Sequence, residues 1–126
     1  MLIRIDFNSD EALYLQLRNQ IIMGIANAEI QEGESLPSVR ELADSIGINM
    51  HTVNKAYSIL RQEGYLKLDR RHGAIICIDE DKHKAELETM NAMRAILARA
   101  ICKDITRSEI QDMVEQIYDE YMGDND

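Results

Sequence analysis

The sequence of 126 residues has no long apolar run and only two cysteines. A membrane-spanning helix needs about 20 consecutive apolar residues, and no stretch approaches that length, so we expect no membrane partner. The opening segment, MLIRIDFNSD, lacks the apolar core of a signal peptide, which predicts a cytoplasmic protein. Cys77 and Cys102 do not have the spacing of metal ligands. In a reducing compartment we expect both to be small apolar residues, and a redox role for them stays open.

Signatures of enzymes are also missing. The sequence contains no nucleophile-elbow serine and no glycine-rich phosphate loop, and His51, His72 and His83 do not have metal-ligand spacing. The many carboxylates fall on expected helix faces or at helix caps, where contact with water is the ordinary explanation. We therefore expect no enzyme, no metal site and no cofactor.

Basic residues are scarce, and the net charge of −9 by itself disfavours a nucleic-acid partner. The charge is unevenly distributed, however. Residues 36–75 carry six basic and four acidic side chains, whereas residues 1–35 carry two and six, and residues 76–126 carry six and thirteen. Salt screens charges that lie more than ~8–10 Å apart, so DNA binding depends on a local basic face and not on the charge of the whole chain.

The basic segment has the pattern of a helix-turn-helix. Ser38, followed three residues later by Glu41, predicts a capping box at the start of a short helix that Gly47 ends. Asn49 predicts the cap of a second helix, which we expect to end at Gly64. The apolar residues of this second helix recur at helical spacing and are Val53, Ala56, Tyr57 and Leu60. Two short helices joined by a glycine also occur in many all-α domains, so this pattern alone does not establish DNA binding.

A predicted hairpin follows the second helix. Residues 65–69 alternate apolar and polar side chains as a half-buried strand does, and residues 74–78 form a second strand-like run. The loop between them is Arg70-Arg71-His72-Gly73. A basic loop beside a helix-turn-helix is typical of the wing of a winged helix, whose guanidinium groups suit phosphates or the minor groove. The predicted fold class is therefore α+β, mainly α with one small β-hairpin.

A longer pattern now becomes visible. It consists of the run Leu36-Pro37-Ser38-Val39-Arg40-Glu41-Leu42-Ala43, then Thr52-Val53, Ala56-Tyr57, Leu60, Glu63-Gly64-Tyr65-Leu66 and Gly73. This pattern resembles the DNA-binding domain of GntR-family bacterial transcription regulators, and the resemblance extends over residues 5–78. It implies a winged helix-turn-helix that binds double-stranded DNA. The sequence departs from the family at the wing, where the usual Gly-x-Gly is reduced to Gly73 alone.

The candidate DNA contacts lie at the start of the second helix, at the start of the helix before it and on the wing. They are Ser38, Arg40, Asn49, Met50, His51, Thr52, Asn54, Lys55, Arg70, Arg71, His72 and Gly73. Arg40 matches a DNA-contacting arginine of the family, and Lys55 and Thr52 are expected at phosphates. Many relatives have Arg or Pro at the position of Met50, and because Met can touch a thymine methyl but cannot pair with guanine, we expect a changed base preference. For Arg40 and His51, an ordinary solvated surface residue is the alternative.

The N-terminal part is expected to support this unit. Leu2–Phe7 is short enough for an edge strand, and Asn8, Ser9 and Asp10 are candidate helix caps. From residue 11 to residue 28 apolar side chains recur at helical spacing, which predicts a scaffold helix that packs on the helix-turn-helix.

Residues 80–126 form a predicted second domain after a winged helix-turn-helix of residues 1–79. We expect a helix from about Lys84 to Cys102, then a capping box of Thr106 and Glu109, and a last helix that continues to the end. Two amphipathic helices cannot bury both apolar stripes against each other, so a second copy of the chain is the expected partner. The residues expected at this dimer interface are Leu87, Met90, Leu97, Ile101, Ile110, Met113, Val114, Ile117 and Tyr121. Packing of the helices on the winged helix is the alternative.

A short tail restricts the resemblance. Most regulators of this family carry a larger C-terminal domain that binds a metabolite, whereas a two-helix tail resembles the small YtrA-like subfamily and implies dimerisation and, in many members, repression of transporter operons. We therefore expect a homodimeric repressor that binds an inverted-repeat operator. A winged-helix module that binds proteins, and a regulator with a small effector site near the tail helices, remain the alternatives. The sequence does not identify an effector.

Overall fold

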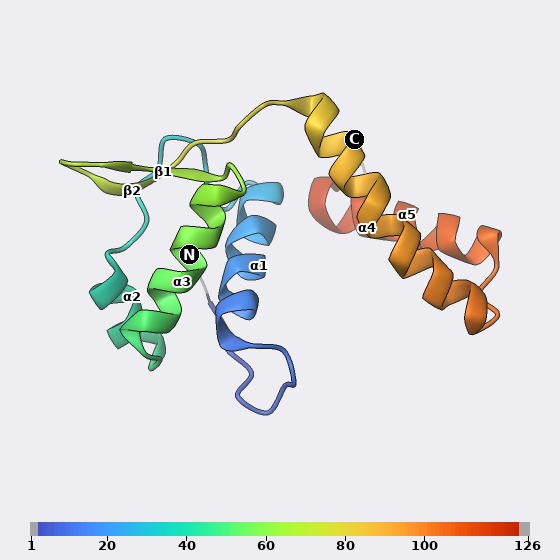
Figure 1. Cartoon of the computed structure of the whole chain (residues 1–126), viewed down its shortest axis with the longest axis horizontal. Helices are drawn as coiled ribbons and strands as arrows, with labels where there is room; N and C mark the ends of the chain where they lie inside the picture. Colours follow the sequence, from blue (N-terminus) through green and yellow to red (C-terminus); the bar gives the residue numbers. More distant parts are fainter. Residues whose placement is uncertain (1–2, 124–126) are drawn as a thin grey trace. The chain divides into compact units, whose positions relative to one another are not determined.

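The computed structural model describes residues 3–123, and the chain divides after Asp79 into two compact units. The described residues contain helices and one antiparallel hairpin (Figure 1). In the first unit these are α1 (Leu13–Ala26), α2 (Val39–Ile46), α3 (Met50–Gln62), β1 (Leu66–Asp69) and β2 (Gly73–Ile76). The second unit contains α4 (Lys82–Cys102) and α5 (Arg107–Met122). The predicted fold class, mainly α with a small hairpin, is confirmed.

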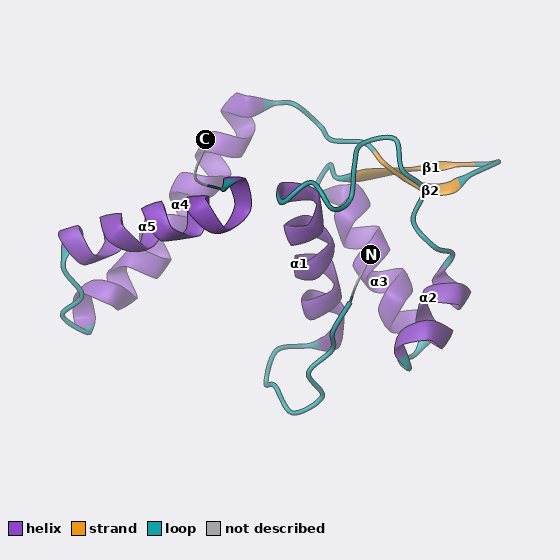
Figure 2. Ribbon diagram, turned by 180° about the vertical axis from the view of Figure 1, so that it is seen from behind, coloured by secondary structure: helices purple, strands orange, loops and turns teal. Residues whose placement is uncertain are grey.

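The core of the first unit lies where α1 packs along α3, with the hairpin crossing near their ends (Figure 2). Leu17 and Ile21 of α1 and Val53 and Leu60 of α3 are completely buried. The predicted apolar stripe of α3 therefore faces the core, as helical spacing requires. Burial of such side chains stabilises the fold by roughly 1.5–3 kcal/mol each.

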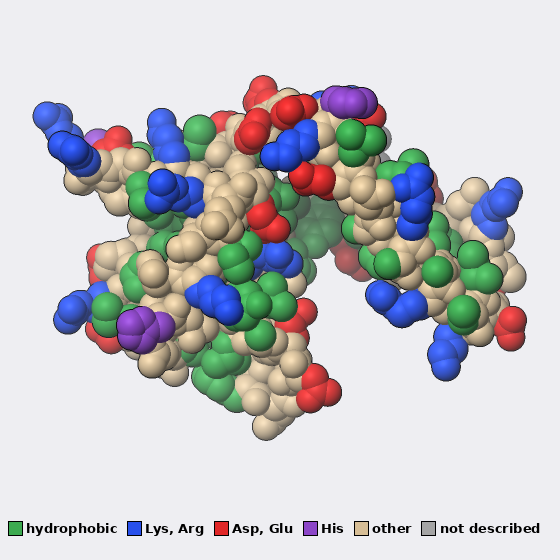
Figure 3. Space-filling model, viewed as in Figure 1, with side chains coloured by type: hydrophobic (Ala, Val, Ile, Leu, Met, Phe, Trp, Pro, Cys, Tyr) green, Lys and Arg blue, Asp and Glu red, His purple; other side chains and the backbone are tan. Residues whose placement is uncertain are grey.

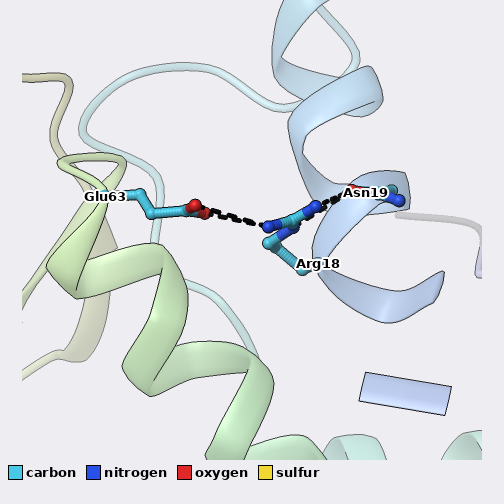
Figure 4. A network of polar contacts seen from close by, with 3 residues as sticks. All are labelled: Arg18, Asn19 and Glu63. Atoms are coloured by element: carbon cyan, nitrogen blue, oxygen red, sulfur yellow. Dashed lines mark hydrogen bonds and ion pairs between the residues drawn. The ribbon is translucent and has the colours of Figure 1, made fainter. Parts of the chain in front are cut away.

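An ion pair links the same two helices on the outside (Figure 4). Nη1 of Arg18 lies 3.3 Å from Oε2 of Glu63, just after α3. The Nε and Nη2 atoms of Arg18 also donate to the side-chain oxygen of Asn19 at 3.0 and 2.7 Å. The neighbouring amide thus orients the guanidinium towards α3.

The turn between α2 and α3 is fixed by helix caps. Ser38 Oγ accepts from the backbone N–H of Glu41 at 3.1 Å, which is one of the two bonds of the predicted capping box. Gly47 ends α2 in the left-handed conformation at φ 72°, and Asn49 Oδ1 accepts from the N–H of His51 at 2.7 Å. These caps confirm the predicted starts of both helices. The end of α3 falls at Gln62, two residues before the predicted Gly64.

The hairpin has the register Leu66 opposite Ile76 and Asp69 opposite Gly73. Both strands are shorter than predicted, because residues 65, 77 and 78 lie outside them. The chain before α2 adds a single bridge, in which Ser35 pairs with Ile75. This bridge and the helices hold the base of the hairpin, and its tip projects on the side of α2 (Figures 1 and 2).

The predicted edge strand at the N-terminus is wrong for residues 3–7, and Leu2 lies outside the described residues. Side chains of α1 take the place of a neighbouring strand. Gln16 Oε1 accepts from the N–H of Asp6 at 2.9 Å, and its Nε2 donates to the carbonyl oxygens of Asp6 and Glu11 at 3.0 and 2.9 Å. Gln20 forms a similar pair of bonds with the backbone of Arg4.

The predicted caps of the first helix are also wrong. α1 begins at Leu13, and its N-cap is Ala12, which has no side chain that could accept a bond. Asn8, Ser9 and Asp10 therefore lie in the loop before the helix. Ser9 stabilises a turn in that loop, because its Oγ accepts from the N–H of Glu11 at 3.1 Å.

In the second unit α4 begins two residues before the predicted start. The capping box of α5 is complete, because Thr106 Oγ1 accepts from the N–H of Glu109 at 3.2 Å and Glu109 Oε1 accepts from the N–H of Thr106 at 3.1 Å. No residue of α4 or of α5 is fully buried within the chain. Within residues 3–123, no helix is long and apolar enough to cross a membrane.

Candidate nucleic-acid interface

The start of α3 presents polar side chains at the surface. His51 and Asn54 are exposed, Met50 is 41% exposed and Thr52 is half-buried. A shallow hollow is lined here by Val39, Asn49, Met50, His51 and Asn54. The first turns of α2 and α3 therefore share one face, and Arg40 on α2 is exposed next to Val39.

Two candidate residues also cap helices. Ser38 Oγ is engaged by the N–H of Glu41, and Asn49 Oδ1 by the N–H of His51. Each side chain is exposed and keeps a further donor, the hydroxyl hydrogen of Ser38 and the amide NH₂ of Asn49. A donor at a helix start suits phosphate oxygens.

A second groove lies between the residues that lead into α2 and the wing. Its lining comprises Ser35, Leu36, Pro37, Ser38, Val39, Glu41, Tyr57, Leu68, His72, Gly73 and Ala74. The structure thus brings Ser38 together with His72 and Gly73, which are far apart in the sequence. Arg70 and Arg71 lie in the turn between the strands, and Figure 3 shows Lys and Arg side chains standing at the tip of the hairpin.

Lys55 is the candidate with an aromatic neighbour. Its Nζ lies 3.9 Å from the centroid of the Tyr14 ring on α1. The electron-rich ring face attracts an ammonium group, by about 0.5–1 kcal/mol at exposed sites. Tyr14 therefore restrains Lys55 beside the start of α1, while Met50, His51 and Asn54 line the hollow at the N-terminal end of α3.

Asp69 holds the turn of the wing. Its Oδ1 accepts from the N–H of Arg71 at 2.7 Å and from the N–H of His72 at 3.1 Å. Both bonds lower the pKa of the Asp69 carboxyl below its usual range, and the bond from Arg71 has the larger effect. Sequence reasoning missed Asp69, although an Asp two residues before a turn residue is a recognised signal for a side-chain-closed turn. It also missed Tyr14, for which the sequence offers no signal of its contact with α3.

No cluster of three or more His, Cys, Asp or Glu side chains suited to a metal ion exists among residues 3–123. Cys77 is half-buried and Cys102 is exposed, and neither forms a disulfide. The chemistry of this surface is thus hydrogen bonding and charge: donors at two helix starts, and guanidiniums on a hairpin beside them.

Comparisons with known proteins agree with this geometry. A family model described as bacterial regulatory proteins, gntR family, matches residues 13–76. The uncharacterised HTH-type transcriptional regulator YhcF of Bacillus subtilis is 33% identical over 89 residues, which are 67% of this chain and 74% of YhcF. The HTH-type transcriptional repressor YtrA of the same species is 39% identical over 75 residues, 60% of this chain but only 58% of YtrA.

Solved structures are similar to this chain over a longer span. A transcriptional antiterminator from Listeria monocytogenes has a TM-score of 0.87 and 25% identity, covering 98% of this chain and 94% of that one. YtrA from Sulfolobus acidocaldarius, a GntR-family transcription factor, has a TM-score of 0.58 and 36% identity, covering 94% of this chain and 97% of that one. Both similarities therefore extend over the winged helix and into the tail.

Proposed function

The chain belongs to the gntR family of bacterial regulatory proteins, as a YtrA-like transcription regulator that binds DNA, and we propose that it acts as a homodimeric repressor on an inverted-repeat operator. Residues 1–79 bind the DNA and residues 80–126 join two copies. The repressor role is proposed by analogy with YtrA from Bacillus subtilis, which is a transcriptional repressor. As a regulator of transcription it works in the cytoplasm, where bacterial DNA lies.

One observation carries the DNA-binding assignment: polar groups at the start of α3 surround an open hollow that α2 also lines. A recognition helix enters the major groove by its N-terminal end, and its first turns contact the bases. Asn54 can pair with adenine through both polar atoms of its amide, and Met50 can contact a thymine methyl. Arg70 and Arg71 on the wing supply the charge for phosphate or minor-groove contact.

The tail supports assembly of two copies. Its large apolar side chains remain exposed within one chain, including Leu87 at 56%, Ile101 at 70% and Ile117 at 49%. Figure 3 shows such side chains along α4. Several Leu, Ile and Met side chains left in water forgo roughly 1.5–3 kcal/mol each. A second copy covers them with a surface of the same kind, and symmetric dimers are the commonest way to do so.

Two recognition helices also give more sequence specificity than one. One winged helix reads only a few base pairs, which is too little against a genome of competing sites. A dimer reads two half-sites with centres one helical turn, ~34–36 Å, or a multiple of it apart. The operator is therefore an inverted repeat.

Binding to an operator obtained by selection from random duplexes tests the assignment. Asn54→Ala should reduce discrimination between operator and scrambled duplex, whereas Arg70→Ala with Arg71→Ala should weaken both alike and make the salt dependence shallower, as loss of phosphate contacts does. Arg40→Ala should cost roughly 1–3 kcal/mol of operator binding if it pairs with a base.

Arg61→Ala is the matched control, since Arg61 is exposed in the last turn of α3, at the end remote from the hollow. It should leave operator binding almost unchanged. Failure to retard any duplex at low salt would remove the DNA-binding assignment. A wing pair that changes sequence preference but not the salt dependence would exchange the roles of wing and helix.

A further inference from the structure

The tip of the wing is organised by one carboxylate oxygen. Asp69 is the last residue of β1 and lies opposite Gly73, the first residue of β2. Its Oδ1 accepts from the backbone N–H groups of Arg71 and His72. The same oxygen lies 3.3 Å from Nδ1 of the His72 ring. One atom thus holds both the backbone of the turn and the side chain that ends it.

The turn of the wing contains a single glycine. The family pattern has Gly-x-Gly here, whereas this chain keeps Gly73 alone, which adopts φ 72°. A residue with a side chain, His72, precedes it. The bonds to Asp69 hold the turn around that side chain, and the exposed ring lies 3.3 Å from the same carboxylate.

The partner of the ring decides which of its nitrogens donates. The hydrogen bond from the N–H of Arg71 lowers the pKa of the Asp69 carboxyl most, and the bond from the N–H of His72 lowers it next. This carboxylate is therefore ionised near neutral pH. An ionised carboxylate only accepts hydrogen bonds. Nδ1 of His72 is therefore the donor, and Nε2 is the nitrogen left for another partner. Nε2 accepts when the ring is neutral and donates when the ring is protonated.

DNA offers unequal partners to these two forms. Phosphate oxygens are acceptors, and the minor-groove edges of A·T pairs present acceptors only. A G·C pair adds a single donor, the guanine amino group. A protonated ring thus finds acceptors on phosphates and in the minor groove of any sequence, whereas a neutral ring finds a donor in the minor groove only at G·C pairs.

We propose that Asp69 is a positioning residue of the wing, which fixes the His72 ring with Nε2 towards DNA and makes the wing bind more tightly when His72 is protonated. This inference rests on the proposed contact between wing and DNA. The charged and titratable groups around the ring are Asp69 on β1, Arg70 and Arg71 in the turn, and Glu41 and Tyr57, which line the same groove from α2 and α3.

The test compares operator affinity at pH 6 and pH 8 for the full-length protein and three variants. The wild type should bind more tightly at pH 6 by roughly two- to fivefold, the range of one exposed charge contact. His72→Gln should lose this difference. Asp69→Asn keeps an oxygen for the turn but no charge, so it should retain affinity at pH 8 and lose much of the difference. Asp69→Ala should weaken binding at both pH values.

His83→Gln is the control, because His83 is an exposed histidine of α4 and lies outside the proposed DNA interface. It should leave the pH difference in place. Persistence of the full difference in His72→Gln, or unchanged binding by Asp69→Ala at both pH values, would overturn the proposal. Asp69→Ala should not change the melting temperature noticeably, since the turn is exposed.

A measurement without DNA separates this inference from the proposed function. Nitrogen NMR of the free protein at pH 8 should show the His72 ring mainly with hydrogen on Nδ1, and Asp69→Ala should shift it towards hydrogen on Nε2. Unchanged ring signals in Asp69→Ala refute the positioning role whether or not the protein binds DNA. A different result would be that the ring signals are as expected but the Arg70→Ala, Arg71→Ala variant binds DNA normally. The failure then lies in the proposed wing contact, and the claim that protonation tightens binding is wrong.

Discussion

The hydroxyl of Tyr57 donates to the carbonyl oxygen of Pro37 over 2.7 Å and so ties α3 to the loop that leads into α2. Tyr57 is only 6% exposed, and its ring lies within the core of the first unit. Pro37 directly precedes the cap Ser38. Together with the helix caps, this bond holds the start of α2 against α3, and with it the face that the two helix starts share.

Tyr57→Phe should destabilise the protein by about 0.5–1.5 kcal/mol, the usual net value of one hydrogen bond, because it leaves the Pro37 carbonyl without this donor while the ring still packs. Urea denaturation measures the change. Tyr118→Phe is the matched control: Tyr118 is 57% exposed on α5, and its change should stay within about 0.5 kcal/mol. Equal effects of the two variants would contradict the assigned role of the bond.

Because the Tyr57 phenol is buried, we also expect the protein to lose stability in alkali. Burial raises the pKa of the Tyr57 phenol above its usual value, and the negative charge of Glu41 adds a smaller effect in the same direction. The folded state keeps the phenol neutral where the unfolded state ionises it, above about pH 10. The stabilisation is therefore complete below that pH and is lost as the pH rises further. Melting temperatures between pH 8 and 11 should fall more steeply for the wild type than for Tyr57→Phe, and identical slopes would refute this.

Local signals explain why the helix-turn-helix could be predicted from the sequence. Ser38 and Asn49 bond to backbone groups two or three residues away, and Gly47 supplies a conformation that few other residues adopt. The apolar spacing of α3 then left one choice for its buried face. Each of these features depends on a short window of sequence, so neighbouring residues are enough to identify it.

The errors arose where partners are distant in the sequence. A run such as residues 3–7 reads as a strand, but a strand needs a sheet edge, and here Gln16 and Gln20 bind its backbone instead. The contact of Tyr14 with Lys55 likewise depends on how α1 packs against α3. The wing is different: the partners of Asp69 lie only two and three residues away, so its closure of the turn was a local signal that the sequence reasoning missed.

Gly64→Ala should destabilise the first unit by roughly 1–3 kcal/mol. Gly64 has φ +86°, which costs a residue with a side chain about 1 kcal/mol, and an added Cβ would lie 2.8 Å from Cβ of Asp79. Its carbonyl oxygen also accepts from the N–H of Asp79 at 2.7 Å, so the backbone cannot move away without losing that bond. Thermal or urea unfolding measures the effect.

Gly33→Ala separates the two causes. Gly33 has a similar φ of +89°, but nothing lies within 4 Å of an added Cβ. This variant should therefore show the conformational cost alone, and the excess in Gly64→Ala measures the close approach of Asp79. If Gly33→Ala is as destabilising as Gly64→Ala, the contact with Asp79 contributes nothing.

Ile117→Glu should convert the proposed dimer into a monomer. Ile117 is 49% exposed in one chain and belongs to an apolar stripe of α5 with Met113 and Val114. Burial of an unpaired carboxylate between two copies costs several kcal/mol, which exceeds what a single interface position contributes. Sedimentation should show the monomer. Operator affinity should fall by roughly a hundredfold or more, because the second half-site no longer binds as part of the same molecule.

Gln116→Glu adds the same charge one residue away, where the side chain points off the apolar stripe, and should leave both the dimer and operator binding intact. A chain that ends at Asp79 should behave like Ile117→Glu, because the first unit contains its own core. Its affinity for a single half-site should equal that of the intact monomer, since the start of α3 and the wing are unchanged. A truncated chain that remains dimeric, or that binds the full inverted repeat as tightly as the intact protein, would show that the contact between copies lies in residues 1–79 and not on α4 and α5.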